Sequence, residues 1–357
     1  MTGKLRVLVV EDSLTVRRRL CDALGSDQNI EIIGEADNGQ RGIELCRSLR
    51  PDVMTLDMHL PVMSGLSATE YIMAHCPTPI LIVSASTNRG ELFKTYDALA
   101  AGAVDVLEKP RGDASDDGWD QRFIAAVKLV ARIRVITHPR ARLGLGTPRL
   151  SAPPSPALTA SGAAPLTVVA LGASTGGPSA LVTVLQGLPV DLGLSILLVL
   201  HIDEPFGTAF AEWLSDQTPH PVRFAVGGEP LETKGSRVLM APPGRHLVVR
   251  DGRIALSDAP ERHSCRPSID VMFEAIAEAA GPRSAAALLT GMGRDGASGL
   301  LALRTAGALT VAQDEETCVV YGMPREAALL DAATRVLPLS GIGPFLADAA
   351  RARRPRS

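Results

Sequence analysis

Short apolar runs alternate with amphipathic segments through almost all of this 357-residue chain. Residues 5–136 contain five such runs, at positions 7–10, 30–33, 53–56, 80–83 and 104–107. Runs this short and this rich in valine, isoleucine and leucine are typical of strands buried on both faces, whereas the segments between them have helical spacing. Regular alternation of strand and helix predicts a parallel sheet with helices on both faces, which is a doubly wound α/β domain.

The same alternation resumes after residue 166 and predicts a second doubly wound domain that is not a copy of the first. Its strands are expected at 168–171, 194–200, 285–289 and 309–312. The Asp251-Gly252 pair in the middle of 246–256 predicts an antiparallel hairpin. An amphipathic helix is expected to follow the hairpin, around residues 271–279.

The segment between the two domains has the composition of a linker. Residues 139–165 contain six prolines and three arginines but no acidic residue, and such a composition favours an extended chain without a core. We therefore expect a first domain at 1–138, a linker at 139–165, a second domain at 166–350 and a short basic tail at 351–357.

Charge and cysteine content narrow the class of protein. The net charge of −3 argues against a general nucleic-acid binder. No apolar run is long enough to span a membrane, and the N-terminus lacks the apolar stretch of a signal peptide. The five cysteines are scattered without a CxxC pair, which is typical of reduced thiols, so we expect a cytoplasmic protein.

Polar residues follow four of the strands expected in the first domain. They are Glu11 and Asp12 after the first strand, Asp57 at the end of the third, Ser84 after the fourth and Lys109 after the fifth. The carboxyl ends of parallel strands share one edge, so these side chains should converge there. Three converging carboxylates repel one another unless a hard cation such as Mg²⁺ joins them, and Lys109 with the metal would neutralise a phosphoryl group on Asp57. The alternative is a solvated acidic rim.

The first domain resembles the receiver domain of two-component response regulators, which has a flavodoxin-like fold. The matching motifs are Val-Val-Glu11-Asp12-Ser, Thr-Leu-Asp57-Met-His-Leu-Pro61-Val-Met-Ser-Gly65, Val-Ser84-Ala and Glu-Lys109-Pro110. The resemblance implies that Asp57 accepts phosphate from a histidine kinase, that Ser84 follows the phosphoryl group and that Lys109 contacts it. Many receivers have an aromatic residue three positions before the lysine, where this chain has Val106. We therefore do not expect a rotating ring to carry the signal.

The same resemblance assigns the metal ligands of the first domain. Glu11 and Asp12 would hold Mg²⁺ together with Asp57. The backbone carbonyl of His59 would be a further ligand from the protein. No cofactor is expected in the second domain.

A glycine-rich turn follows the first strand of the second domain. It reads Gly172-x-Ser174-x-Gly176-Gly177, and Pro178 suits the first turn of the next helix. Such a turn can expose a serine oxygen beside backbone N–H groups that would bind an oxyanion. A turn of this kind also cradles phosphates in other proteins, or serves only as a tight turn, so the pattern alone does not identify a nucleophile.

Ser174, His201 and Asp295 follow three predicted strands of the second domain and should meet at one edge of its sheet. Serine needs a base to take its proton, a histidine titrates in the right range, and a carboxylate fixes the histidine tautomer. His246 and His263 compete with His201 for the role of base, although both lie in or beside predicted hairpin and loop segments.

The second domain resembles the catalytic domain of the chemotaxis protein-glutamate methylesterase family, CheB, with a Rossmann-like fold. The matching motifs are Leu-Gly-Ala-Ser174-Thr-Gly-Gly, His201 with Phe206 following, Cys-Arg266-Pro-Ser-Ile-Asp270-Val, Leu-Thr-Gly-Met292-Gly-Arg-Asp295-Gly and Gln313-Asp-Glu-Glu-Thr-Cys-Val-Val-Tyr-Gly-Met-Pro324-Arg-Glu. The resemblance implies that Ser174 is the nucleophile, His201 the general base and acid, and Asp295 the residue that orients it.

The family also suggests two supporting groups and one departure. Thr175 would support the histidine, and the backbone N–H of Met292 would help to bind the oxyanion. Leu200 stands before His201 where the family often has glutamine, so the contacts with substrate beside the base are expected to differ.

The resemblance implies a hydrolase that removes methyl groups from glutamate esters of chemoreceptors and deamidates receptor glutamines. Phosphorylation by a histidine kinase of the CheA type would relieve a block by the receiver. Two other classes remain open. One is a phosphorylation-gated binding protein with an inactive hydrolase domain, which the intact Ser174, His201 and Asp295 disfavour. The other is a regulator that binds DNA, but no basic recognition helix is evident besides the short tail at 351–356.

Overall fold

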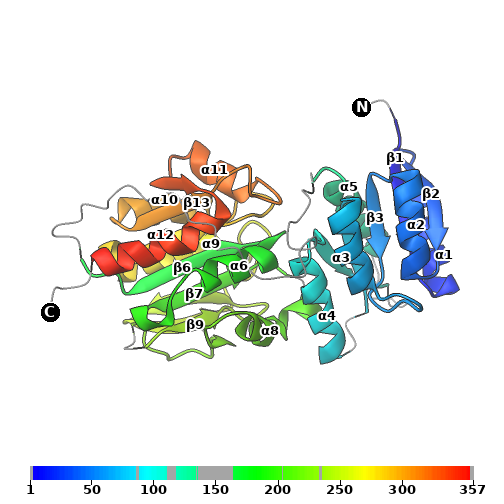
Figure 1. Ribbon diagram of the computed structural model, residues 1–357. Helices are drawn as coiled ribbons and strands as arrows, with labels where there is room; N and C mark the ends of the chain where they lie inside the picture. The colour runs from blue at the N-terminus through cyan, green and yellow to red at the C-terminus, as the bar shows by residue number, and fades with distance from the viewer. Residues whose placement is uncertain are drawn as a thin grey trace. The chain divides into compact units, whose positions relative to one another are not determined.

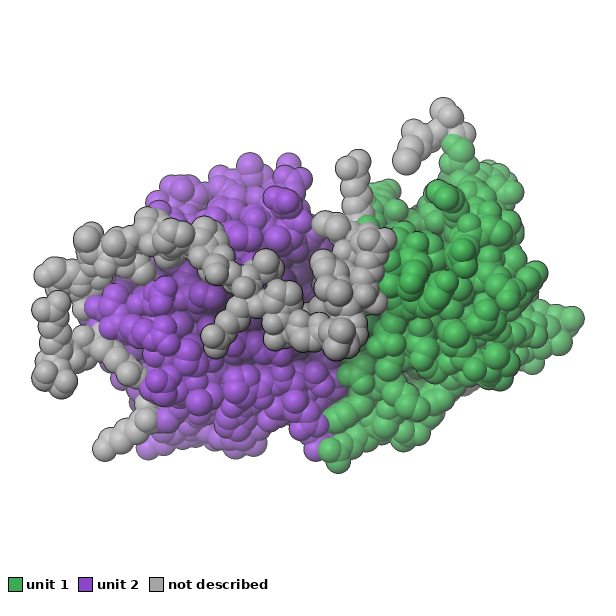
Figure 2. Space-filling view, in the orientation of Figure 1, with its two compact units in different colours: residues 1–148 green, residues 149–357 purple. Residues whose placement is uncertain are grey.

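The computed structural model describes residues 3–85, 88–110, 118–133, 135, 164–202, 204–232 and 235–353. The chain forms two compact units, residues 1–148 and 149–357 (Figure 2). The expected linker at 139–165 lies almost entirely outside the described residues, as do residues 354–357 of the expected basic tail.

The first unit is a five-stranded parallel sheet in the order β2-β1-β3-β4-β5 (Figure 1). Its strands are β1 (Leu5–Val10), β2 (Ile30–Ala36), β3 (Val53–Leu56), β4 (Ile80–Ser84) and β5 (Asp105–Glu108). Its helices are α1 (Leu14–Gly25), α2 (Gly39–Leu49), α3 (Gly65–His75), α4 (Arg89–Ala100) and α5 (Trp119–Val130). Helix α1 packs with α5, whereas α2, α3 and α4 pack in a row. The predicted doubly wound fold of this unit is confirmed.

Side-chain caps mark where α1, α2, α3 and α4 begin. Ser13, Asn38, Ser64 and Asn88 each accept a hydrogen bond from the backbone N–H three residues later. A cap of this kind satisfies one of the free N–H groups of the first turn. The starts of α1, α2, α3 and α4 are therefore defined by local sequence.

Gly65 lets α3 start directly against the end of β3. A Cβ atom at this position would lie 2.2 Å from the backbone oxygen of Asp57 and 2.8 Å from the Cα atom of Met58. No side chain fits in that space, so glycine is required for the close approach. The backbone that carries Asp57 is consequently held in place by the first turn of α3.

The second unit contains a seven-stranded parallel sheet in the order β14-β13-β12-β6-β7-β9-β8. Its strands are β6 (Val168–Ala173), β7 (Ser195–Leu200), β8 (Val222–Phe224), β9 (Arg237–Met240), β12 (Ser284–Leu288), β13 (Leu309–Gln313) and β14 (Arg335–Leu337). The chain builds outward from β6 in one direction and then from β12 in the other. A crevice for ligands is expected at such a reversal, beyond the carboxyl ends of β6 and β12.

Helices cover both faces of this second sheet (Figure 1). One group packs together as α9 (Ile269–Ala279), α10 (Ala297–Thr305) and α11 (Met323–Leu329), and the other as α6 (Gly177–Gln186), α8 (Phe210–Gln217) and α12 (Leu339–Ala352). A short helix, α7 (Glu204–Gly207), precedes α8. All six residues of β6 are buried, as its apolar sequence predicts.

The predicted hairpin is also present. Strands β10 (His246–Arg250) and β11 (Arg253–Ser257) pair antiparallel, and the two residues between them, Asp251 and Gly252, have φ values of 51° and 69°. Positive φ at both positions is the backbone of the tight turn that an Asp-Gly pair favours. Among the described residues, no helix has the length and apolar character needed to span a bilayer.

Candidate active site

Ser174 follows the last residue of β6 and lies in the turn that leads into α6. The backbone N–H of Ser174 donates to the backbone oxygen of Thr290 at 3.0 Å, and the backbone oxygen of Ser174 accepts from the Gly177 N–H at 2.6 Å. Gly176 has a φ of 76°, and a Cβ atom there would lie 2.5 Å from Cβ of Val319. The described residues provide no hydrogen-bond partner for Ser174 Oγ, so the hydroxyl is free to meet a substrate.

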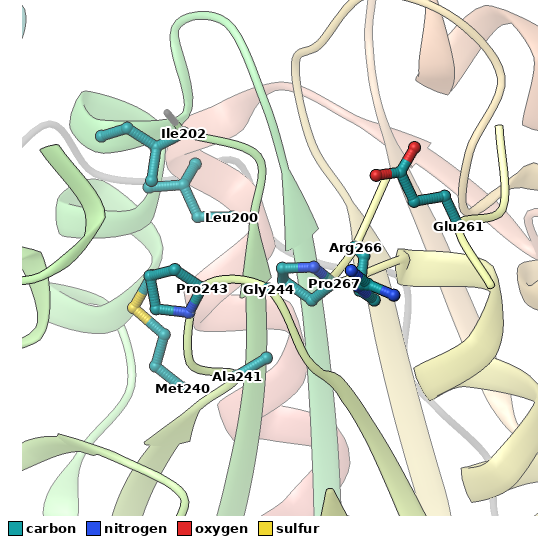
Figure 3. A pocket seen from close by; sticks show the side chains of 9 residues that line it. All are labelled: Leu200, Ile202, Met240, Ala241, Pro243, Gly244, Glu261, Arg266 and Pro267. Atoms are coloured by element: carbon teal, nitrogen blue, oxygen red, sulfur yellow. The ribbon is translucent and has the colours of Figure 1, made fainter. Parts of the chain in front are cut away.

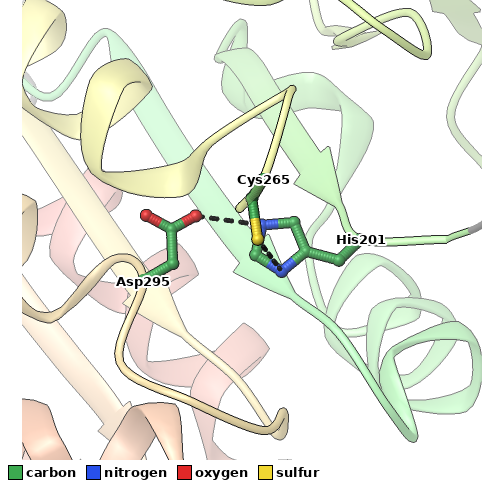
Figure 4. A group of neighbouring side chains, drawn as sticks. All are labelled: His201, Cys265 and Asp295. Atoms are coloured by element: carbon green, nitrogen blue, oxygen red, sulfur yellow. Dashed lines mark hydrogen bonds and ion pairs between the residues drawn. The ribbon is translucent and has the colours of Figure 1, made fainter. Parts of the chain in front are cut away.

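His201 follows the last residue of β7, the strand next to β6. Its backbone N–H donates to the Ala173 oxygen at 3.0 Å, which brings it beside the turn that holds Ser174. On the ring, Nε2 lies 2.9 Å from Oδ2 of Asp295, and Nδ1 lies 3.8 Å from Sγ of Cys265 (Figure 4). The described residues show no hydrogen bond between His201 and Ser174. In this resting arrangement the thiol of Cys265, not the serine hydroxyl, faces Nδ1.

Asp295 is held by four donors although it is 2% exposed. Its Oδ1 accepts from Ser268 Oγ at 2.7 Å and from the Asp270 N–H at 3.1 Å, and its Oδ2 accepts from the Ile269 N–H at 2.7 Å and from His201. Burial favours the neutral acid, but these hydrogen bonds, that from His201 foremost, lower the pKa of Asp295 overall. An ionised carboxylate only accepts, so Nε2 of His201 must carry a hydrogen.

Asp295 lies farther from its strand than Ser174 and His201 lie from theirs. Strand β12 ends at Leu288, and Asp295 comes seven residues later, just before α10. The intervening loop is anchored to another segment, since the Gly291 N–H donates to the Val320 oxygen at 3.0 Å. The Asp295 carboxylate reaches Nε2 of His201 from this anchored loop.

The protonation of His201 depends on its neighbours. Burial disfavours the charged ring, but the hydrogen bond to Asp295 and the contact with Cys265 outweigh burial and raise the pKa of His201 to about 9. The resting ring is therefore mostly protonated near neutral pH. It acts as a base only after it loses the proton on Nδ1.

The two competing histidines are both occupied by other partners. His246 is buried; its Nε2 lies 3.1 Å from the backbone oxygen of Pro260, and its Nδ1 accepts from the Ser268 N–H at 3.1 Å. His263 lies 3.1 Å from Oδ2 of Asp270 through Nε2, and Arg294 donates to its Nδ1 at 3.2 Å. His201 is the histidine that lies beside the Ser174 turn.

Thr175 and Met292 flank the serine turn. Thr175 is buried, and its backbone oxygen accepts from Oγ1 of Thr290 at 3.0 Å. The Met292 side chain is 55% exposed. No described residue accepts a hydrogen bond from the Met292 N–H, so this group is available to an oxyanion.

Gln313 is a supporting residue whose role the sequence did not indicate. It is fully buried at the end of β13, and its Oε1 accepts from the Thr290 N–H at 2.8 Å while its Nε2 donates to the Thr317 oxygen at 2.8 Å. It thereby braces the loop that carries Met292 and Asp295. A long polar side chain at the end of a buried strand was the available signal. Ser268 and Cys265 gave no comparable signal.

A cavity of about 260 Å³ opens beside His201 (Figure 3). Aliphatic side chains and prolines form much of its wall, with one acid and one arginine: Leu200, Ile202, Met240, Ala241, Pro243, Gly244, Glu261, Arg266 and Pro267. Leu200, which directly precedes His201, contributes to this wall. The cavity has room for a few side-chain atoms of a bound protein.

The first unit gathers its predicted site residues at one sheet edge. Lys109 Nζ lies 2.9 Å from Oδ2 of Asp57 and 2.8 Å from Oε2 of Glu11, both of which are buried. Glu11, exposed Asp12 and Asp57 each offer a carboxylate oxygen within 4.8 Å of the others. Ser84 Oγ is buried, and no described residue hydrogen-bonds to it.

The acidic cluster of the first unit fits a hard divalent cation. Burial, followed by the charge of Asp57, raises the pKa of Glu11 to about 7 despite the contact with Lys109. Burial likewise raises the pKa of Asp57, and its Oδ1 is buried without a hydrogen-bond partner among the described residues. An unsatisfied oxygen in an all-oxygen donor set is what Mg²⁺ would complete. Val106 is buried in β5, three residues before Lys109.

Two family models match the chain. Residues 169–346 match the model described as CheB methylesterase, and residues 7–115 match the response regulator receiver domain. Both matches fall on the units that carry the two sites described above.

Full-length relatives agree with these matches. Protein-glutamate methylesterase/protein-glutamine glutaminase 2 of Anaeromyxobacter dehalogenans is 41% identical over 347 residues, covering 97% of each chain. The protein-glutamate methylesterase/protein-glutamine glutaminase of Nitrosospira multiformis is 42% identical over 347 residues, covering 96% of each. The crystal structure of the Thermotoga maritima CheB methylesterase catalytic domain is 31% identical, with a TM-score of 0.48, and covers 51% of this chain and 98% of its own.

Proposed function

Because the chain belongs to the CheB methylesterase family and carries a response regulator receiver domain, we propose that it hydrolyses glutamate methyl esters on chemoreceptors through Ser174, His201 and Asp295. It is an enzyme, a protein-glutamate methylesterase and protein-glutamine glutaminase. Its product, a free receptor glutamate, would support sensory adaptation. The observation that carries the mechanism is the 2.9 Å hydrogen bond between His201 and buried Asp295, beside the turn that exposes Ser174.

In the first half-reaction Ser174 Oγ attacks the ester carbonyl. Its proton passes to Nδ1 of His201, because Nε2 keeps its hydrogen on Asp295. The tetrahedral intermediate carries a negative oxygen, and the unpartnered N–H of Met292 is the nearby donor suited to it. Collapse breaks the bond to the methoxy oxygen, which leaves as methanol with the proton from Nδ1.

In the second half-reaction water attacks the acyl-serine. His201 takes one proton from the water and returns it to Ser174 Oγ as the receptor carboxylate departs. A glutamine side chain follows the same course, except that ammonia leaves in place of methanol. One set of residues thus serves both activities.

The receiver supplies the regulation in this proposal. Asp57 would take a phosphoryl group from a CheA-type histidine kinase, with Lys109 and Ser84 contacting the added oxygens. Glu11, Asp12 and Asp57 would hold Mg²⁺, which offsets the charge of the phosphoryl group when bound. Phosphorylation would raise esterase activity, since the hydrolase is the output domain that this chain offers.

The direct test is methanol release from methylated receptor membranes. Ser174→Ala should lose nearly all activity, on the order of 10⁶-fold if chemistry limits turnover, while its thermal unfolding stays unchanged. His201→Ala should lose about as much, and the double variant should be little worse, because the residues act as a unit. Activity of Ser174→Ala within tenfold of the unmodified enzyme would refute the nucleophile assignment.

A further inference from the structure

We propose that Cys265 and His201 form an inhibitory site for Zn²⁺ or a similar thiophilic divalent ion, which occupies the imidazole nitrogen needed for catalysis. The inhibition rests on the proposed role of His201 as the base, whereas the binding itself does not. His201, Cys265 and Asp295 form one cluster, in which each offers a potential ligand atom within 4.8 Å of the others (Figure 4).

The first argument is the separation of the two donors. Cys265 Sγ lies 3.8 Å from Nδ1 of His201. Typical zinc bonds of about 2.05 Å to nitrogen and about 2.3 Å to sulfur, at a tetrahedral angle, place the two donor atoms about 3.6 Å apart. The donors already stand close to this spacing, so an ion can be held with a small adjustment of the cysteine side chain.

The second argument is the orientation of the imidazole. Histidine ligands in metal sites usually donate their other N–H to a carboxylate, which fixes the ring and makes the free nitrogen a better donor. Asp295 does this at Nε2, and its own position is fixed by three donors at the start of α9. The nitrogen left for an ion is therefore Nδ1, the one that faces Cys265.

The third argument is the placement of the thiol. Cys265 lies in a tight turn in which its backbone N–H and oxygen both pair with Arg262, at 2.9 and 3.1 Å. The His201 side chain is 16% exposed and Cys265 is half-buried, so an ion can enter from solvent. Two protein donors leave the remaining coordination positions to water, as in an open zinc site.

The chemistry of binding accounts for inhibition. The ion bonds to the thiolate sulfur and to the Nδ1 lone pair, and the protons displaced from the thiol and from a protonated ring pass to solvent. Nδ1 then has no lone pair with which to take the serine proton. Removing the ion restores the base, so inhibition is reversible.

The two sites of this chain should select different ions. Thiolate and imidazole donors favour zinc, whereas the all-oxygen set of Glu11, Asp12 and Asp57 favours magnesium. Millimolar Mg²⁺ should therefore leave the esterase uninhibited. Zn²⁺ should inhibit in its presence.

Binding is tested without relying on activity. The full-length Ser174→Ala chain is titrated with Co²⁺, a spectroscopic substitute for Zn²⁺, in buffer containing excess Mg²⁺. We expect a thiolate-to-cobalt charge-transfer band in the near ultraviolet that Zn²⁺ displaces. Adding Cys265→Ser or Cys265→Ala should remove that band, whereas Cys318→Ser, a change at another half-buried thiol of the same unit, should retain it. A band that is unchanged by both Cys265 variants would overturn the site.

Inhibition is tested in the chain with Ser174 intact. Methanol release is measured over a Zn²⁺ series, and each variant is normalised to its own metal-free rate. Cys265→Ser should need at least about tenfold more Zn²⁺ for half-inhibition than the parent enzyme or Cys318→Ser, because it lacks the sulfur ligand. A zinc-selective chelator should restore the parent rate. Equal Zn²⁺ concentrations for half-inhibition of the parent enzyme and of Cys265→Ser would contradict the proposal. If the Cys265 variants lose the cobalt band but neither the parent nor any variant releases methanol, the metal site stands and the proposed function is wrong.

Discussion

Both nitrogens of the His201 ring have a partner in the resting enzyme, and this determines how activity should depend on pH. The neutral ring is the base, so the active fraction grows as pH rises through the pKa of about 9. We expect kcat/KM, measured by methanol release with a zinc chelator present, to climb tenfold per unit from about pH 7 and to level off above about pH 9. A profile that is flat across this range would contradict the raised pKa.

In the proposed mechanism Asp295 orients the imidazole of His201 and stabilises its positive charge, and an amide substitution removes both effects. Asp295→Asn keeps the size of the side chain but offers an NH₂ group toward a ring nitrogen and cannot stabilise the imidazolium. By analogy with the serine protease triad, kcat should fall by about 10³–10⁴-fold. Ser268→Ala is the matched control, since it removes one donor to Oδ1 and leaves the bond to His201. If Asp295→Asn has the same esterase activity as Ser268→Ala, Asp295 does not assist His201 in catalysis.

The sequence predicted which residues would gather but not all of their contacts. Ser174 and His201 directly follow buried strands, and that rule alone brings them to one sheet edge. The contact between Cys265 and His201 depends on a turn in which His263 and Ser264 both have positive φ. Positive φ is uncommon for any residue other than glycine, and two such residues in a row form no recognisable sequence pattern, so the turn could not be predicted.

At the scale of elements, the turn between β6 and α6 has no room for a side chain at Gly176, and a substitution that adds one methyl group tests this. Gly176→Ala places a Cβ atom 2.5 Å from Val319 in a backbone with φ of 76°, so the turn that carries Ser174 must shift. A displacement of about 1 Å in a catalytic group can cost about 10²-fold in rate, and we expect a loss of that order in kcat.

Gly227→Ala is the matched control for this turn. Gly227 also has a positive φ, 88°, but a Cβ atom there meets nothing within 4 Å. It should therefore lose about 1 kcal/mol of stability from backbone strain alone and keep its esterase rate within about twofold. Thermal unfolding and methanol release, measured on both variants, distinguish strain from displacement. Equal rates in the two variants would mean that the Val319 contact does not position the serine.

Element prediction succeeded where periodicity is strong and failed for the shortest strands. The long apolar runs, such as 168–171, and the Asp-Gly hairpin are present as predicted. Strands β8 and β14 were not predicted, because three residues are too few for a period to emerge. The four-residue strand β9 was also not predicted, although β3 and β5 are equally short and were. The end strand β14 is also largely exposed.

For the whole molecule, the gating proposal makes a prediction about the receiver. Deleting residues 1–138 should raise esterase activity without phosphate, and a phosphodonor should raise the full-length rate toward the same ceiling. If about 1% of molecules are open at rest, the gain is at most about a hundredfold. Methanol release is compared for the deletion, the full-length chain and Asp57→Asn, which should stay at the resting rate with the donor. If the deletion variant is no faster than the unphosphorylated full-length chain, the receiver does not block the hydrolase and the gating proposal is wrong.

The carboxylate that orients His201 also caps α9. The amide hydrogens of Ile269 and Asp270 both point at Asp295, and α9 packs against β6 and α10 in the interior of its unit. Any opening that frees the carboxylate must therefore expose these two amides to solvent. Their rates of deuterium uptake consequently report on the integrity of the catalytic pair, and on heating the enzyme should lose its chemistry only when α9 begins to come away from the sheet.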